Sequence, residues 1–138
     1  MDDKIRNTQA GITTVVCGLL KNKAGLIFAA QRGSSQNEAG YWEFPGGKVE
    51  AGESLHAALA RELLEELNLR VRVGRYLAET TFSRNSKNFR LVAFSASAEA
   101  NQKLKLSEHA QAGWFSYSQL QSLNLLPADV VLLQKIRC

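Results

Sequence analysis

Long hydrophobic runs are missing from this chain of 138 residues. The longest unbroken apolar stretch is residues 26–30 (LIFAA), whereas a membrane-spanning helix needs about 20 apolar residues. The first ten residues (MDDKIRNTQA) are polar and lack the apolar centre of a signal peptide. We therefore expect no membrane anchor, no membrane partner and a cytoplasmic location.

Cysteine and proline are also scarce, with two of each. Cys17 and Cys138 give neither a disulfide framework nor a metal-ligand spacing, which is typical of a protein from a reducing compartment. We expect Cys17 in the core, because it lies in an apolar segment, and Cys138 as an idle terminal thiol. The low proline content and ten glycines exclude collagen-like and Pro-rich sequences.

What remains is the composition of an ordinary globular protein. Hydrophobic residues make up 45% of the chain and charged residues 22%, which excludes a mainly disordered protein. The length fits one domain, and we expect residues 11–138 to form it behind a loose tail at residues 1–10. The net charge of +4 makes anionic partners plausible without choosing between nucleic acid and a phosphorylated metabolite.

Hydrophobic patterning predicts strands followed by helices, twice over. Residues 12–20 are rich in β-branched residues and residues 26–31 form a second short apolar segment, so we expect two strands in a hairpin with its turn at residues 21–25. A helix is expected at residues 54–67, capped by Glu53 or Ser54 at its start and by Asn68 in the left-handed region at its end. Further expected elements are strands at 69–82, 89–98 and 113–116 and helices at 118–123 and 127–137. This order indicates an α+β fold, an α/β/α sandwich with helices on both faces of a mixed sheet.

The helix at residues 54–67 carries three carboxylates on one arc, because Glu62, Glu65 and Glu66 stand at i, i+3 and i+4. The opposite side is expected to face the core, with Leu55 and Leu59 projecting nearer the acidic arc. That core side contains Ala57, Ala60, Leu63, Leu64 and Leu67. Such an arc is most often a solvated helix face. Its surroundings decide between that reading and a functional site.

Those surroundings favour a divalent cation. Like charges at this spacing repel, and a hard cation such as Mg²⁺ removes the repulsion by binding carboxylate oxygens. Glu53 lies just before the helix, and Arg61 can hold a neighbouring carboxylate with its planar guanidinium. Gly46 and Gly47 allow the backbone to approach a metal or a phosphate closely. The combination points to phosphoryl chemistry.

The same residues resemble the signature of the Nudix family. One position departs, because the family has Gly where this chain has Asn68, and a left-handed helix end tolerates Asn. The matching positions are Gly47, Glu53, Arg61, Glu62, Leu63, Glu65, Glu66 and Leu69. The family's α/β/α sandwich also agrees with the expected order of elements.

The resemblance extends to the MutT-like branch, the nucleoside triphosphate pyrophosphohydrolases. Residues 30–32 (AQR), 41–50 (YWEFPGGKVE) and 126–130 (LPADV) are similar to that branch. The resemblance implies a Mg²⁺-dependent enzyme, with Mn²⁺ as a substitute, that releases a nucleoside monophosphate and pyrophosphate in nucleotide-pool sanitation. It implies a small-molecule nucleotide as partner, no stable nucleic acid, and a monomer or weak homodimer.

The resemblance also implies roles for individual residues. Glu62 would orient or deprotonate water, Glu53 would be a supporting ligand or the base, and Arg61 would pair with a carboxylate. Which Glu is the base stays open, and Glu108 is an additional ligand or base, or else a solvated loop acid. The implied metal ligands are Gly46, Glu62, Glu65, Glu66 and Glu108. The implied substrate-binding residues are Arg32, Glu43, Phe44, Pro45, Gly46 and Asp129.

Asp129 is the residue that indicates which nucleobase the substrate carries. An ionised carboxylate accepts hydrogen bonds, which suits the exocyclic amine of cytosine and favours the CTP pyrophosphohydrolase branch over 8-oxo-dGTP diphosphatases. The alternative is a helix-end charge. Arg84, Lys87 and Arg90 are expected to cluster near a hairpin, as a solvated edge or as triphosphate ligands, and His56 and His109 carry no recognisable pattern.

Two other functions compete with this one. A Nudix enzyme could act on ADP-ribose, a dinucleoside polyphosphate or a cap-like molecule, but the short loop at residues 33–40 argues against it. A non-catalytic Nudix-like module would bind nucleotides without hydrolysis, but such modules usually lose signature carboxylates that this chain keeps.

Overall fold

The computed structural model describes residues 11–137, and its elements follow the expected order of strands and helices. Residues 1–10 and Cys138, for which we expected a tail and an idle thiol, lie outside the described residues. In chain order the elements are β1 (Ile12–Leu20), β2 (Ile27–Gln31), β3 (Trp42–Glu43), β4 (Gly46–Lys48), α2 (Leu55–Leu67), β5 (Val71–Arg84), β6 (Lys87–Ala98), β7 (Gln111–Phe115), α3 (Tyr117–Ser122) and α4 (Pro127–Arg137). Among these helices, none has the length and apolar content needed to cross a bilayer.

The strands form two sheets rather than one. A four-stranded sheet has the order β4-β1-β6-β5, and a three-stranded sheet has the order β3-β2-β7. β1 runs parallel to β6 along its whole length and antiparallel to β4. Both edges of β1 are therefore occupied, and the expected hairpin with β2 is wrong. Just beyond β1, Lys21 forms an isolated bridge with Ile27, and the Asn22 amide donates to the Leu26 carbonyl at 3.0 Å, so a turn connects the two strands without a ladder between them.

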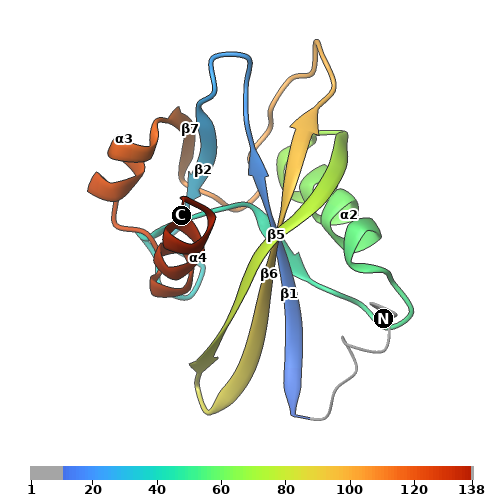
Figure 1. Ribbon diagram of the computed structural model, residues 1–138, viewed down its shortest axis with the longest axis vertical. Helices are drawn as coiled ribbons and strands as arrows, with labels where there is room; N and C mark the ends of the chain where they lie inside the picture. The colour runs from blue at the N-terminus through green and yellow to red at the C-terminus, as the bar shows by residue number, and fades with distance from the viewer. Residues whose placement is uncertain (1–10, 138) are drawn as a thin grey trace.

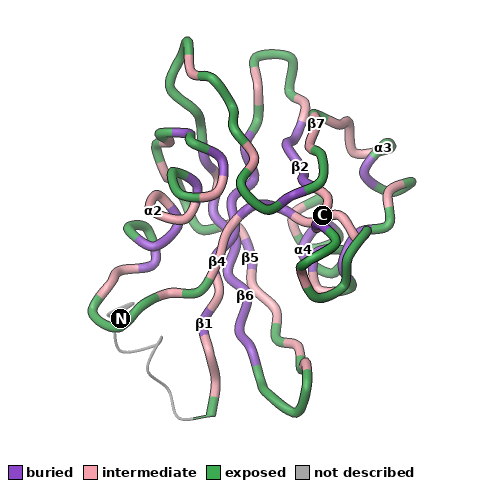
Figure 2. The backbone as a smooth tube through the Cα atoms, turned by 180° about the vertical axis from the view of Figure 1, so that it is seen from behind, coloured by how far each residue is buried: buried purple, intermediate pink, exposed green. Residues whose placement is uncertain are grey.

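Helices cover both faces of the strands, which confirms the α+β sandwich (Figure 1). α2 lies on one side, and α3 and α4 lie on the other. Neighbouring residues of β1 point to opposite sides, so Val16 packs in the core beneath α2 and Cys17 in the core beneath α4. The buried backbone in Figure 2 runs through the crossing of the strands, between these two helical layers.

The ends of α2 follow the sequence expectation, but its buried face does not. The Ser54 hydroxyl accepts a hydrogen bond from the Ala57 amide at 3.1 Å, and Asn68 has a φ of 57°. Leu55 and Leu59 are buried, whereas Leu64 is 43% exposed. The assignment of Leu64 and Ala57 to the core was therefore wrong. The buried face is rotated toward the acidic arc, which brings its carboxylates to the edge of the core.

The later elements lie within a few residues of their expected positions. β5 is shifted by two residues from its expected position and β6 is longer than expected, and the two meet in a tight turn at Asn85 and Ser86, both with positive φ. α4 begins at Pro127, as expected for a residue suited to the first helical turn. The short β4 was not predicted as a strand, and it places Gly46 and Gly47 directly against β1.

Candidate active site

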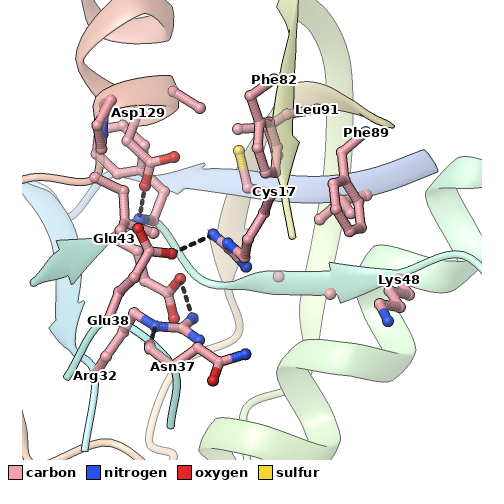
Figure 3. A pocket seen from close by; sticks show the side chains of 18 of the residues that line it. Cys17, Arg32, Asn37, Glu38, Glu43, Lys48, Phe82, Phe89, Leu91 and Asp129 are labelled. Carbon is pink, nitrogen blue, oxygen red and sulfur yellow. Dashed lines mark hydrogen bonds and ion pairs between the residues drawn. The ribbon is translucent and has the colours of Figure 1, made fainter. Parts of the chain in front are cut away.

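A cavity of about 460 Å³ opens where β4, the β5–β6 hairpin, the loop after β2 and the start of α4 meet. Figure 3 shows Arg32, Asn37, Glu38 and Glu43 grouped on one side of it, with Phe82, Phe89 and Leu91 on the other. Phe82 and Phe89 stack with their ring centroids 5.0 Å apart. Residues from both sides of the strands therefore contribute to one pocket. Its lining includes Cys17, Arg32, Glu43, Phe44, Gly46, Gly47, Lys48, Glu66, Arg84, Lys87, Leu126 and Asp129.

Arg61 organises the acidic end of α2. Its guanidinium contacts both oxygens of Glu53 at 2.7 and 2.9 Å, Glu62 at 3.0 Å and Glu65 at 3.2 Å. It also donates to the carbonyl of Lys48 at 3.1 Å, which connects the helix to β4. The Arg61 contact lowers the pKa of Glu53. This arginine therefore fixes the carboxylates of the signature relative to one another.

Glu62 packs against the glycine pair of β4. A Cβ atom on Gly47 would overlap the Glu62 carboxylate, and one on Gly46 would overlap the carbonyl of Val16 in β1. Burial raises the pKa of Glu62, and the hydrogen bond from Arg61 opposes that rise. The absence of side chains at both glycines thus lets Glu62 lie against the backbone at the cavity wall.

Glu66 is the signature carboxylate that lines the cavity. Burial raises its pKa to about 7, with the charge on His109 opposing and the charges of Glu62, Glu43 and Glu108 adding to the rise. Its Oε1 atom is buried and has no hydrogen-bond partner. Leaving a buried carboxylate oxygen unpaired is costly, and a divalent cation would remove that cost.

The signature carboxylates are chemically suited to a metal ion, but their side chains do not converge on one point. Within residues 11–137, no three His, Cys, Asp or Glu side chains are arranged to hold a metal ion. Glu65 is exposed and turned to Arg61, while Glu66 has an unpaired oxygen. Carboxylate oxygens beside a glycine backbone are a donor set that Mg²⁺ accepts. The residues present therefore fit a divalent cation once a side chain turns from Arg61.

Glu108 lies near Glu66 but does not line the cavity. Its charge contributes to the raised pKa of Glu66. Its loop is held by a hydrogen bond from the Ser107 amide to the Glu66 carbonyl at 3.2 Å, and its own carbonyl packs against Gly33. Pro45 does not line the cavity either, and its carbonyl accepts from the amide of Gly18 at 2.9 Å.

Arg32 and Glu43 form an ion pair at the cavity wall, with 2.9 Å between Arg32 Nη1 and Glu43 Oε1. The other oxygen of Glu43, Oε2, lies 2.9 Å from Nε2 of His109. The His109 side chain is only 1% exposed. Sequence reasoning missed this histidine, because no motif marks it and its partner Glu43 is 66 residues away.

The opposite end of the cavity contains Asp129, at the start of α4. Its Oδ2 atom accepts a hydrogen bond from the Phe44 amide at 2.9 Å, and the residue is 4% exposed. Burial raises its pKa to about 8, while the Phe44 hydrogen bond opposes the rise. Burial and the nearby charges of Asp129 and Glu43 also raise the pKa of Cys17. Cys17 is buried at the cavity wall, and within residues 11–137 its thiol is free.

The expected cluster of cations at the hairpin separates into two faces. Arg84 and Lys87 line the cavity, and Arg84 pairs with Glu38 at 2.7 Å, which joins the hairpin to the loop after β2. Arg90 was placed wrongly, because alternation along β6 turns it to the opposite face of the sheet. There it binds Glu79 with two nitrogens, at 2.9 and 3.2 Å.

Comparison with known proteins agrees with this geometry. The family model described as NUDIX domain matches residues 11–136. The CTP pyrophosphohydrolase of Escherichia coli is 37% identical over 120 residues, which cover 87% of each chain. A putative 8-oxo-dGTP diphosphatase 2 of Mycobacterium tuberculosis is 36% identical over 110 residues, covering 75% of this chain and 73% of the relative.

Solved structures give the same result for the fold. The solution structure of the E. coli ORF135 protein superposes with a TM-score of 0.79 and 34% identity, covering 91% of this chain and 89% of that one. The crystal structure of the MutT protein from Methanosarcina mazei gives a TM-score of 0.82 at 27% identity, covering 91% and 93%.

Proposed function

The chain belongs to the Nudix family of hydrolases, and from that premise we propose that it is a Mg²⁺-dependent nucleoside triphosphate pyrophosphohydrolase that favours cytosine nucleotides. One observation carries the proposal. A single cavity joins the partly buried carboxylate of Glu66 and the Gly46–Gly47 backbone to the buried carboxyl of Asp129, with Arg32 at its wall. Glu66 and the Gly46–Gly47 backbone suit a metal ion and phosphate groups, and Asp129 suits the nucleobase.

Glu62, Glu65, Glu66 and the carbonyl of Gly46 would hold the metal, with Glu108 as an additional candidate. A divalent cation held there would supply neutralisation of phosphate charge and a lower pKa for water. Arg61 keeps Glu53 ionised and fixes its position. Glu62 is the better proton acceptor, because burial raises its pKa whereas Arg61 lowers that of Glu53. Arg32 would bind the nucleotide through its planar guanidinium.

Asp129 is proposed to select the base. The Phe44 amide occupies Oδ2, which leaves Oδ1 for the ligand. The pKa of Asp129 is about 8, so this step requires the ionised form, which an amine donor facing Oδ1 favours; Oδ1 then accepts a hydrogen bond from the exocyclic amine of cytosine. A base without that donor would leave the carboxylate unpaired, which costs a few kcal/mol at most. Similarity to a CTP pyrophosphohydrolase supports this preference.

A second candidate is 8-oxo-dGTP diphosphatase activity. The pKa of Asp129 is about 8, so near neutral pH the carboxyl carries a proton and can donate to a carbonyl oxygen such as O6 of a guanine. Similarity to 8-oxo-dGTP diphosphatases also supports it. A non-catalytic role is disfavoured, because every carboxylate of the signature is present.

The experiment is a substrate panel of CTP, dCTP, 5-hydroxy-dCTP, 8-oxo-dGTP and ADP-ribose, with and without Mg²⁺. We expect pyrophosphate and a monophosphate from the cytosine nucleotides only when Mg²⁺ is present. A higher kcat/KM for 8-oxo-dGTP would favour the second candidate. Release of orthophosphate, or no turnover of any triphosphate, would contradict the proposal.

A further inference from the structure

A buried histidine completes a chain of three polar side chains at the cavity wall. Arg32, Glu43 and His109 are linked by two contacts of 2.9 Å, and each contact uses a different oxygen of Glu43. Arg32 is also held through its Nε atom, which donates to the carbonyl of Asn37. The position of the Arg32 guanidinium at the cavity wall thus depends on the Glu43 carboxylate, which His109 holds through its other oxygen.

The direction of the hydrogen bond follows from chemistry. An ionised carboxylate can only accept, so Nε2 of His109 carries the proton and donates to Glu43 Oε2. Nδ1 is buried without a hydrogen-bond partner. The His109 ring therefore makes its hydrogen bond through Nε2 alone, and the partner is Glu43.

The three-stranded sheet fixes the distance between these groups. Ala30 of β2 pairs with Glu43 of β3 on one side and with Ala112 of β7 on the other. His109 lies just before β7, where the Ala110 amide donates to the Gln31 carbonyl at 2.9 Å. A buried side chain on such a frame has little freedom to let Glu43 turn away.

We propose that His109 is a positioning residue for substrate binding, which acts through Glu43 to hold the guanidinium of Arg32 in the cavity. The proposal rests on the function proposed above, in which Arg32 contacts the nucleotide. His109 contacts Glu43 rather than a signature carboxylate, and it acts on Glu66 only through its charge. Its loss should therefore weaken nucleotide binding before it affects the chemical step.

Amide variants give matched tests, because Gln places a donor near the position of Nε2 and Asn places one near that of Nδ1. We expect His109→Asn and His109→Leu to raise KM for dCTP about tenfold, as expected for a lost hydrogen bond to a charged group, with kcat changed less than about threefold. His109→Gln should stay within about threefold of the wild type in KM. His56→Leu, at an exposed histidine of α2, is the control and should leave KM unchanged.

Dependence on Arg32 is tested with double variants. Arg32→Lys should raise KM, and adding His109→Asn should raise it little further, because the two act as one unit. Additive effects, or equal KM values for the Gln and Asn variants, would overturn the proposal. So would an Asn variant with a lower melting temperature and an unchanged KM.

An NMR measurement separates this inference from the proposed function. The Nε–H signal of Arg32, assigned by its disappearance in Arg32→Lys, should shift in His109→Asn and stay in place in His109→Gln, without any nucleotide. An unmoved Arg32 signal in His109→Asn contradicts the positioning role, whatever the enzyme hydrolyses. A wild-type protein inactive on every triphosphate contradicts the proposed function instead, whatever the Arg32 signal does.

Discussion

Glu53 and Glu62 share Arg61 as a partner, but their pKa values shift in opposite directions. The Arg61 hydrogen bond lowers the pKa of Glu53, and burial raises that of Glu62. We expect Glu62→Gln to lower kcat about a hundredfold, roughly 2.7 kcal/mol of transition-state stabilisation, and Glu53→Gln to cost less. The measurement is kcat of both variants at saturating Mg²⁺. A larger loss in Glu53→Gln would assign the base to Glu53.

The buried carboxyl of Asp129 makes stability depend on pH. Burial raises its pKa from 3.8 to about 8, so between these values the folded protein keeps a proton that the unfolded chain releases. This contribution to stability is complete below about pH 4 and is lost as the pH rises to about 8. Asn does not titrate and its carbonyl can still accept from the Phe44 amide.

We therefore expect Asp129→Asn to gain stability relative to the wild type as the pH rises from 5 to 8. The gain should reach at most about 1.4 kcal/mol per pH unit. Urea unfolding of both proteins at pH 5, 6, 7 and 8 measures it. A difference in unfolding free energy that stays constant over this range would show that Asp129 does not titrate near pH 8.

The same substitution tests base selection. In Asp129→Asn the Phe44 amide holds the carbonyl oxygen, so the NH₂ group replaces Oδ1 and faces the exocyclic amine of cytosine with a donor. We expect kcat/KM to fall more for dCTP than for 8-oxo-dGTP, with the Mg²⁺ dependence unchanged. An unaltered ratio between the two substrates would leave Asp129 as a helix-end charge.

At the scale of elements, β4 forms the wall of the cavity where we propose that the metal binds, and its two glycines should respond differently to a methyl group. In Gly46→Ala the Cβ would overlap the backbone carbonyl of Val16, which cannot move without disturbing β1. We expect a melting temperature lower by several degrees, corresponding to roughly 1–3 kcal/mol of overpacking. In Gly47→Ala the overlap is with the Glu62 carboxylate, the end of a flexible side chain.

Gly47→Ala should therefore keep most of its stability and lose activity, because Glu62 is displaced from the cavity wall. Thermal unfolding and kcat of both alanine variants separate the two effects. A Gly47→Ala protein with normal turnover would show that the position of Glu62 against β4 is not needed.

The elements differ in how well the sequence predicted them. The two ends of α2 were predicted correctly, because the Ser54 cap and the left-handed Asn68 are local. The β1–β2 hairpin was wrong, because β1 pairs with β6, more than 70 residues along the chain, and no local pattern records that partner. The face of α2 was misjudged for the same reason, since only packing against both sheets decides which leucines are buried.

The candidate site was predictable to a similar extent. The signature supplied Gly47, Glu62 and Glu66 by spacing; Gly47 and Glu66 line the cavity, and the Glu62 carboxylate lies against Gly47. His109 and the ion pair between Glu38 and Arg84 could not be found, because their partners come from different elements. The raised pKa of Asp129 also depends on burial, which the sequence alone does not give.

At the scale of the molecule, the two helical layers supply residues to the cavity from opposite sides of the strands. α2 brings the signature carboxylates to the cavity from one side of the strands, and α4 brings Asp129 from the other. The chain carries a net charge of +4, and Arg32, Lys48, Arg84 and Lys87 line the cavity beside its carboxylates. An anionic nucleotide would therefore meet these cations at the cavity wall. Its phosphates would be repelled by the Glu66 carboxylate unless a metal ion lay between them.

The most direct test of a metal-dependent site is turnover of Glu66→Gln at increasing Mg²⁺. The unpaired buried oxygen of Glu66 motivates this choice. We expect kcat at least about a hundredfold below that of the wild type at saturating Mg²⁺, with the melting temperature in metal-free buffer equal or higher, because a buried charge has been removed. Near-normal turnover of Glu66→Gln at saturating Mg²⁺ would contradict the assignment of this carboxylate to the metal.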